Sequence, residues 1–105
     1  MKKNKLATID ILGTTYTIYE SLPEYDELLR KLDGYVTPTT KTIMLNKNAA
    51  PLYKKHILKH ELVHAFLYES GLDDQSWGGN EEIVDWIALQ SDKINKTFKS
   101  IAKII

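Results

Sequence analysis

Alternating apolar and polar residues near the start of the chain predict a β-hairpin. Residues 6–20 alternate on both sides of Gly13 and Thr14 and are rich in β-branched and aromatic side chains, as is typical of strands with one buried face. A shorter run of strand-forming residues, 42–46, follows Pro38. Because proline lacks the N–H that a sheet ladder needs, its own segment is expected to form a turn rather than a central strand. These patterns predict a small N-terminal sheet.

Two later segments have the spacing of amphipathic helices. Residues 22–32 place apolar side chains three and four positions apart after a capping-box pattern at Ser21, which predicts a short helix inserted between the strands. Residues 51–70 contain no helix breaker after Pro51, which suits the first turn of a helix. Gly71 follows, where a helix C-terminus favours glycine. A long helix is therefore predicted over 51–70.

A further helix is predicted to begin after Asn80. Asparagine is a favoured N-cap, and Glu81 and Glu82 place negative charge in the first turn, where the helix dipole favours it. The pattern allows a break near Ser91 and Asp92. The apolar positions otherwise form one stripe, made of Ile83, Ile87, Ile94, Phe98, Ile101 and Ile105.

The length of 105 residues fits one α+β domain spanning 1–105, with the small sheet packed on the helix 51–70 and on the glutamate-bearing helix that follows. A composition of 43% hydrophobic and 27% charged residues is that of a globular protein. A core of this size often needs further support. The chain has no cysteine, so that support is expected from a histidine and carboxylate metal site or from self-association rather than from disulfides.

Charge and hydropathy argue against several functions. The 14 basic and 14 acidic side chains cancel, unlike the excess of positive charge expected of a nucleic-acid-binding protein. No run approaches the roughly 18 apolar residues of a membrane span, and Asp10 and Gly13 interrupt any signal-peptide core. We therefore expect a cytoplasmic protein that binds neither nucleic acid nor membranes, as a monomer or weak homodimer. Ile104 and Ile105 are expected to pack in the core, with a dimer contact as the alternative.

Three histidines, at positions 56, 60 and 64, lie in the predicted helix 51–70, and the last two belong to an HExxH motif, His60-Glu61-Leu62-Val63-His64. Residues four apart are neighbours on one helix face, so His60 and His64 can each direct a ring nitrogen at one ion. Glu61 lies about 100° round the helix, where it can contact a water on that ion without coordinating the ion. His56 lies roughly 12 Å along the axis from His64 and is interpreted as a partly exposed helix histidine.

A catalytic zinc site needs a third protein ligand, which must here be a carboxylate. Glu69 continues the same helix but is offset from the histidine face. Glu81 and Asp85 lie four residues apart at the start of the next helix and can both face the first helix if the two are antiparallel. Glu81 is the predicted third ligand, with Glu82 as the alternative. Asp85 is expected to accept the other ring N–H of a ligand histidine.

This combination resembles the gluzincin metallopeptidases, in which HExxH on one helix is followed by an Asn-Glu-x-x-x-Asp-like segment on the next. The second segment here is Asn80-Glu81-Glu82-Ile83-Val84-Asp85. The run from His60 to Gly71 is also similar to that of minimal single-domain gluzincins (minigluzincins) and of small ImmA/IrrE-type proteins of phages and mobile elements. The resemblance, which covers residues 56–89, implies a zincin-like fold and Zn²⁺ bound by His60, His64 and Glu81. It also implies Glu61 as general base and Asp85 as the support of a ligand histidine.

The predicted function is zinc-dependent hydrolysis of peptide bonds, with Glu61 as the general base on a zinc-bound water. The substrate would be a peptide or protein, including a repressor or other regulatory protein. If residues 42–45 form the sheet edge beside the cleft, a peptide can align there by strand addition. The residue that stabilises the oxyanion stays open among Tyr35, Tyr53 and Tyr68. The alternative function is a non-catalytic or latent zinc-stabilised module that binds a regulatory protein.

Overall fold

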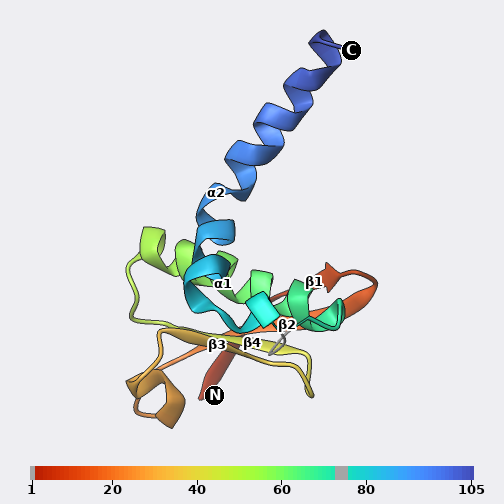
Figure 1. Ribbon diagram of the computed structural model, residues 1–105. Coiled ribbons are helices and arrows are strands. Elements are labelled where there is room, and N and C mark those ends of the chain that lie inside the picture. Colours follow the sequence, from red (N-terminus) through yellow and green to blue (C-terminus); the bar gives the residue numbers. More distant parts are fainter. Residues whose placement is uncertain (1, 73–75) are drawn as a thin grey trace.

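The computed structural model describes residues 2–72 and 76–105, and its N-terminal half contains a four-stranded sheet (Figure 1). The strand order is β1-β2-β4-β3, so β1 and β3 are its edges. β1 pairs with β2 and β3 with β4 in antiparallel fashion, whereas β2 and β4 are parallel. The strands are Lys3–Ile11 (β1), Thr14–Ser21 (β2), Gly34–Thr37 (β3) and Thr42–Asn46 (β4). With the two long helices of the described residues, the structure is mixed α+β, as predicted.

The predicted hairpin is present, with its turn one residue earlier than the sequence suggests. Leu12 and Gly13 have positive φ angles of 51° and 89°, as in the two-residue turns whose twist matches that of antiparallel strands. The N–H of Gly13 also donates to the carboxylate of Asp10 at 3.3 Å. Gly13 adopts this backbone conformation without the steric cost that a Cβ atom would add.

β4 is an interior strand, so the prediction that residues 42–45 form the edge beside the cleft is wrong. β4 is paired with β2 on one side and with β3 on the other, and its Ile43 and Leu45 are buried. The edge on that side is β3, which precedes Pro38. Pro38 itself lies outside the strands, in agreement with its missing N–H.

The helix predicted over 22–32 is reduced to one 3-10 turn, η1, at Glu27–Arg30. Ser21 does not cap a helix because it ends β2, and its hydroxyl donates to the carbonyl of Lys2 at 2.5 Å. Asp26 provides the cap instead, since its carboxylate accepts the N–H of Leu28 at 3.1 Å. Leu29 is the buried residue of this turn, so the apolar spacing predicts a longer helix than one buried side chain supports.

The first long helix, α1, spans Pro51–Glu69 and lies over one face of the sheet (Figure 1). It ends as predicted, because Gly71 has a φ of 75° and the N–H of Leu72 donates to the carbonyl of Leu67 at 2.9 Å. Ile57 and Ala65 are the residues of α1 whose side chains are buried in the main hydrophobic core. The strand residues buried in that core are Ile11, Tyr16, Ile18, Ile43 and Leu45.

The second long helix, α2, spans Glu81–Lys99 and follows a 3-10 turn, η2, at Ser76–Gly79. The predicted cap is present, since the side chain of Asn80 accepts the N–H of Ile83 at 3.0 Å. The helix continues through positions 91 and 92, so the break that the sequence allows there does not occur. The buried Val84 and Ala88 lie in the part of α2 that packs on α1.

The second half of α2 and a final 3-10 turn, η3, at Ser100–Lys103 extend away from the sheet and α1 (Figure 1). The molecule is accordingly elongated, with extents of 54 × 29 × 25 Å. Ile104 and Ile105 are 78% and 96% exposed, so the expectation that they pack in the core is wrong. Within residues 2–72 and 76–105, no helix has the length and apolar character needed to cross a membrane.

Candidate metal centre

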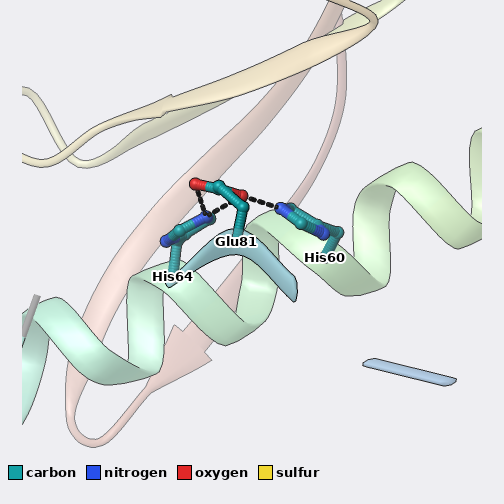
Figure 2. Close-up of side chains that lie close together, drawn as sticks. All are labelled: His60, His64 and Glu81. Carbon is teal, nitrogen blue, oxygen red and sulfur yellow. Dashed lines mark hydrogen bonds and ion pairs between the residues drawn. The ribbon is translucent and has the colours of Figure 1, made fainter. Parts of the chain in front are cut away.

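α1 and α2 bring two histidines and a glutamate together (Figure 2). His60 and His64 lie one turn apart on α1, with 5.0 Å between their ring centroids. Glu81, the first residue of α2, places Oε2 2.7 Å from Nε2 of His60 and Oε1 2.9 Å from Nε2 of His64. Ligand atoms from the three side chains all lie within 4.8 Å of one another, so these predicted ligands could together hold a metal ion.

The position at which α2 begins determines whether Glu81 or Glu82 faces the two histidines. Asn80 caps the helix, so Glu81 lies in its first turn and extends toward the two histidines (Figure 2). Glu82 is about 100° further round the helix, is exposed, and does not line the groove at the cluster. Between the two glutamates that the sequence left open, the geometry therefore favours Glu81.

Asp85 lies one turn after Glu81 and contacts two histidines of α1. Its Oδ1 is 3.0 Å from Nδ1 of His60 and 2.9 Å from Nε2 of His56. An N–H on Nδ1 of His60 donated to this carboxylate leaves Nε2 of the same ring for a metal. Sequence reasoning missed the contact of His56, although its position four residues before His60 is a signal that both lie on one helix face.

Glu61 is buried beneath this cluster, with 9% of its surface exposed. It lies next to His60 along α1 and lines the same groove as His60, His64 and Glu81. A buried carboxylate that lines an open groove is unusual, because burial costs the charged form its hydration. Glu61 is therefore a candidate for proton transfer to or from a molecule bound there.

A groove of about 660 Å³ opens over the cluster. One wall is α1 with the first turns of α2, and the other is the edge strand β3 with the residues just before it. β3 lies close to α1 at Gly34, since a Cβ atom there would be 2.6 Å from Cγ2 of Ile57. The groove thus lies between the candidate metal ligands and a sheet edge.

The three candidate tyrosines differ in position. Tyr35 and Tyr53 line the groove, whereas Tyr68 does not, and the ammonium of Lys41 lies 4.7 Å from its ring centroid. The hydroxyl of Tyr53 donates to Asp33 at 2.8 Å and that of Tyr35 donates to Asp26. The hydrogen bond to Asp33 raises the pKa of Tyr53. The pKa of Tyr35 is raised mainly by burial and, to a smaller extent, by the hydrogen bond to Asp26.

Glu69 takes no part in the cluster, as its offset on the helix predicts. Its carboxylate accepts hydrogen bonds from Tyr16 at 2.6 Å and Thr14 at 3.0 Å, and it forms an ion pair with Lys41 at 2.8 Å. The bonds from Lys41 and Tyr16 keep the pKa of Glu69 below its usual value. Glu69 instead joins the end of α1 to the hairpin.

The pKa values of His60, Glu81 and Glu61 reflect a balance between burial and the charged groups around them. Burial lowers the pKa of His60, but hydrogen bonds to Asp85 and Glu81 and the negative charges nearby outweigh it, so the pKa is raised overall. Burial raises the pKa of Glu81, but hydrogen bonds and charges from His64 and His60 lower it overall. Burial is the largest effect on Glu61 and raises its pKa against the opposing charges of the two histidines.

The donor set suits a zinc ion. Two imidazole nitrogens and one carboxylate oxygen leave a fourth position open, the ligand number of catalytic zinc sites. Tetrahedral bonds of about 2.0–2.2 Å place ligand atoms about 3.3 Å apart, slightly further than the 2.7 and 2.9 Å between Glu81 and the histidines. The side chain of Glu81 is 67% exposed, so it has room to withdraw by the few tenths of an ångström required.

Comparison of the chain with family models, with curated proteins and with solved structures finds no significant match. A functional assignment therefore depends on the geometry of the centre itself.

Proposed function

We propose that the chain is a zinc-dependent metallopeptidase of the gluzincin type. One observation carries the proposal: ligand atoms of His60, His64 and Glu81 lie within 4.8 Å of one another, beside the buried Glu61 in an open groove. A structural zinc site would have four protein ligands and no open position. The HExxH spacing and the glutamate on the following helix, which resemble those of gluzincins, support the same conclusion.

Each residue has a distinct part in the proposed reaction. His60, His64 and Glu81 would hold the ion, and Asp85 would keep Nε2 of His60 directed at it. Zinc bound there would supply a Lewis acid that polarises a carbonyl and lowers the pKa of water toward about 7. Glu61 accepts a proton from the attacking water and transfers it to the leaving amine nitrogen as the C–N bond breaks.

β3 gives the substrate a place to bind. It is an edge strand, so alternate N–H and C=O groups point away from β4. It forms the wall of the groove opposite His60 and Glu61. An extended peptide added to this edge would place a backbone carbonyl within the groove, so the substrate class we propose is an extended peptide segment.

The first prediction tests the general base. Glu61→Gln should keep about one zinc per chain, as measured by elemental analysis, while cleavage of a mixture of fluorescence-quenched peptides falls by about a hundred- to ten-thousandfold. The amide retains the shape of the side chain but does not accept the proton. Glu24→Gln, the same change at an exposed turn residue, is the matched control and should cleave as the parent does.

Two results would contradict the proposal. Equal cleavage by the parent and Glu61→Gln would remove Glu61 as the base. Stoichiometric zinc with no cleavage by the parent would favour the alternative of a zinc-stabilised module that binds a regulatory protein.

A further inference from the structure

The groove at the candidate metal centre extends past the metal ligands to a second end. Tyr53 lies seven residues before His60 on α1, which is about 10 Å along the helix axis, and it lines the same groove. Beside it are Leu32 and Asp33, the two residues that precede β3. These three residues, Leu32, Asp33 and Tyr53, form what is called here the distal end of the groove.

The distal end combines a carboxylate with exposed apolar surface. The hydroxyl of Tyr53 donates to Oδ2 of Asp33 at 2.8 Å, which holds the carboxylate beside the aromatic ring. Tyr53 and Leu32 leave 50% and 47% of their surfaces exposed. A lysine or arginine side chain packs its aliphatic stem on apolar surface and directs its charged head to an anion or to the face of an aromatic ring. The distal end therefore has the chemistry of a pocket for a basic side chain.

The charge of the whole groove favours the same ligand. The described residues that line it include four carboxylates and neither lysine nor arginine. The carboxylates are those of Asp33, Glu61, Glu81 and Asp85. A zinc ion at the centre would neutralise two of these negative charges and leave the groove negative. A concave surface of one charge sign attracts ligands of the opposite sign, so a cationic substrate is favoured.

The charge of Asp33 is available to such a ligand. Nearby basic side chains are directed elsewhere, since Nε of Arg30 donates to the carbonyl of Pro23 at 3.3 Å and the ammonium of Lys54 pairs with Glu20 at 3.1 Å. Within residues 2–72 and 76–105, no ion pair includes Asp33. A bound cation would give this carboxylate its ionic partner.

The length of the groove indicates which substrate residue reaches Asp33. Gly34, the first residue of β3, lies against Ile57, which is between Tyr53 and His60 on α1. β3 therefore leads from the distal end toward the candidate metal centre. A peptide added to this edge advances about 3.3 Å per residue, so the separation of about 10 Å along α1 corresponds to about three residues.

We propose that Asp33 determines substrate specificity by binding a lysine or arginine side chain about three residues from the scissile bond, with Tyr53 positioning its carboxylate. The inference rests on the proposed peptidase function, because it assigns part of the same groove to the substrate. It narrows the substrate class from an extended peptide to an extended basic peptide.

Paired peptides test the inference. The bond that the parent cleaves in a mixture of fluorescence-quenched peptides is first located by mass spectrometry. Each position on either side of that bond is then occupied by lysine or by norleucine, which has a similar aliphatic stem without the charge. At a position about three residues from the bond, kcat/KM should be about tenfold or more higher with lysine, as expected of a hydrogen bond to a charged group.

Substitutions at the distal end should change this preference. Asp33→Asn keeps the shape and an acceptor for the Tyr53 hydroxyl but removes the charge, so the preference should fall below about twofold. Tyr53→Phe keeps the ring but frees the carboxylate, so it should reduce the preference to an intermediate value. Asp33→Lys should favour glutamate over lysine at the same position. Glu27→Gln is the matched control, because it removes a negative charge from an exposed residue six positions before Asp33 and outside the groove lining.

The outcomes separate this inference from the proposed function. Cleavage by the parent without a lysine preference at any position would overturn the inference and leave the peptidase proposal standing. An equal preference in the parent and Asp33→Asn would do the same. Equal losses in Asp33→Asn and Glu27→Gln would indicate a general effect of charge rather than contact with Asp33, and would also overturn it. Failure of the zinc-loaded parent to cleave any peptide would contradict the proposed function and the inference together.

Discussion

Nδ1 of His60 faces Asp85 and its Nε2 faces Glu81, so carboxylates one turn apart on α2 contact the two nitrogens of one ring. A histidine held this way has its ring orientation and tautomer set before a metal arrives. His56 reaches Asp85 from the other side at 2.9 Å and so helps to hold that carboxylate in place. The centre is therefore built from pairs of residues four apart on two facing helices.

At this scale the choice between Glu81 and Glu82 can be tested directly. Glu81→Gln should weaken zinc binding by more than about a hundredfold, since even partners of ligands are worth 10- to 100-fold in metal affinity. Glu82→Gln makes the identical chemical change one residue along the helix and should bind zinc as the parent does. Titration against a chromophoric chelator measures both constants. Equal weakening by the two substitutions would mean that Glu81 is not the third ligand.

Among the elements, α1 and β3 determine the width of the groove. They approach so closely at Gly34 that an added Cβ atom would be 2.6 Å from Cγ2 of Ile57 and 3.0 Å from the carbonyl oxygen of Met44. The Met44 oxygen belongs to the backbone of β4 and cannot rotate away. Glycine at this position is thus explained by packing, not by a positive φ.

Gly34→Ala should destabilise the fold by about 1–3 kcal/mol, the usual cost of overpacking a core. Urea unfolding followed by circular dichroism measures it. The cost should be smaller when the substitution is made in an Ile57→Ala background, because the closest clashing atom is then absent. The same loss in both backgrounds would show that contact with Ile57 is not the cause.

For the molecule as a whole, the candidate centre joins α1 to α2. The ionic contacts of His60, His64, Asp85 and Glu81 lie where the first turns of α2 meet α1. The core beneath is formed largely by the sheet and α1. Protonation or metal binding at the centre should therefore change the strength of the contact between α2 and α1, and with it the stability of the fold.

Stability without metal should fall as the pH rises from about 5.5 to about 8. The raised pKa of His60 contributes stability that is complete below about pH 6.5 and is lost as the pH rises through the folded value. The raised pKa of Glu61 acts in the same direction. The lowered pKa of Glu81 contributes stability that is present above about pH 4.5 and is lost only in acid.

Zinc should reverse this trend, because metal and protons compete for the same histidine nitrogens. The rise in melting temperature caused by zinc should therefore be larger at about pH 8 than at about pH 5.5. Calorimetry of the chelator-treated and zinc-loaded protein at both pH values measures it. A metal-free protein that becomes more stable between these values would contradict the arrangement of charges described above.

Sequence alone determined the features that depend on neighbouring residues. The end of α1 at Gly71, the cap at Asn80 and the shared face of His60 and His64 all follow from local backbone geometry, which repeats every few residues whatever surrounds it.

Only the tertiary structure decided the features that depend on distant residues. Apolar spacing over 22–32 predicted a helix, but only Leu29 there is buried, so one 3-10 turn sufficed. Strand order depends on which strands pair with one another. The observed order places β4 inside the sheet and makes β3 the edge strand beside the groove. The approach of α2 to α1 brought Glu81 to the histidines and paired His56 with Asp85. Periodicity shows that a face is apolar or charged, but what meets that face is settled by packing between segments far apart in the chain.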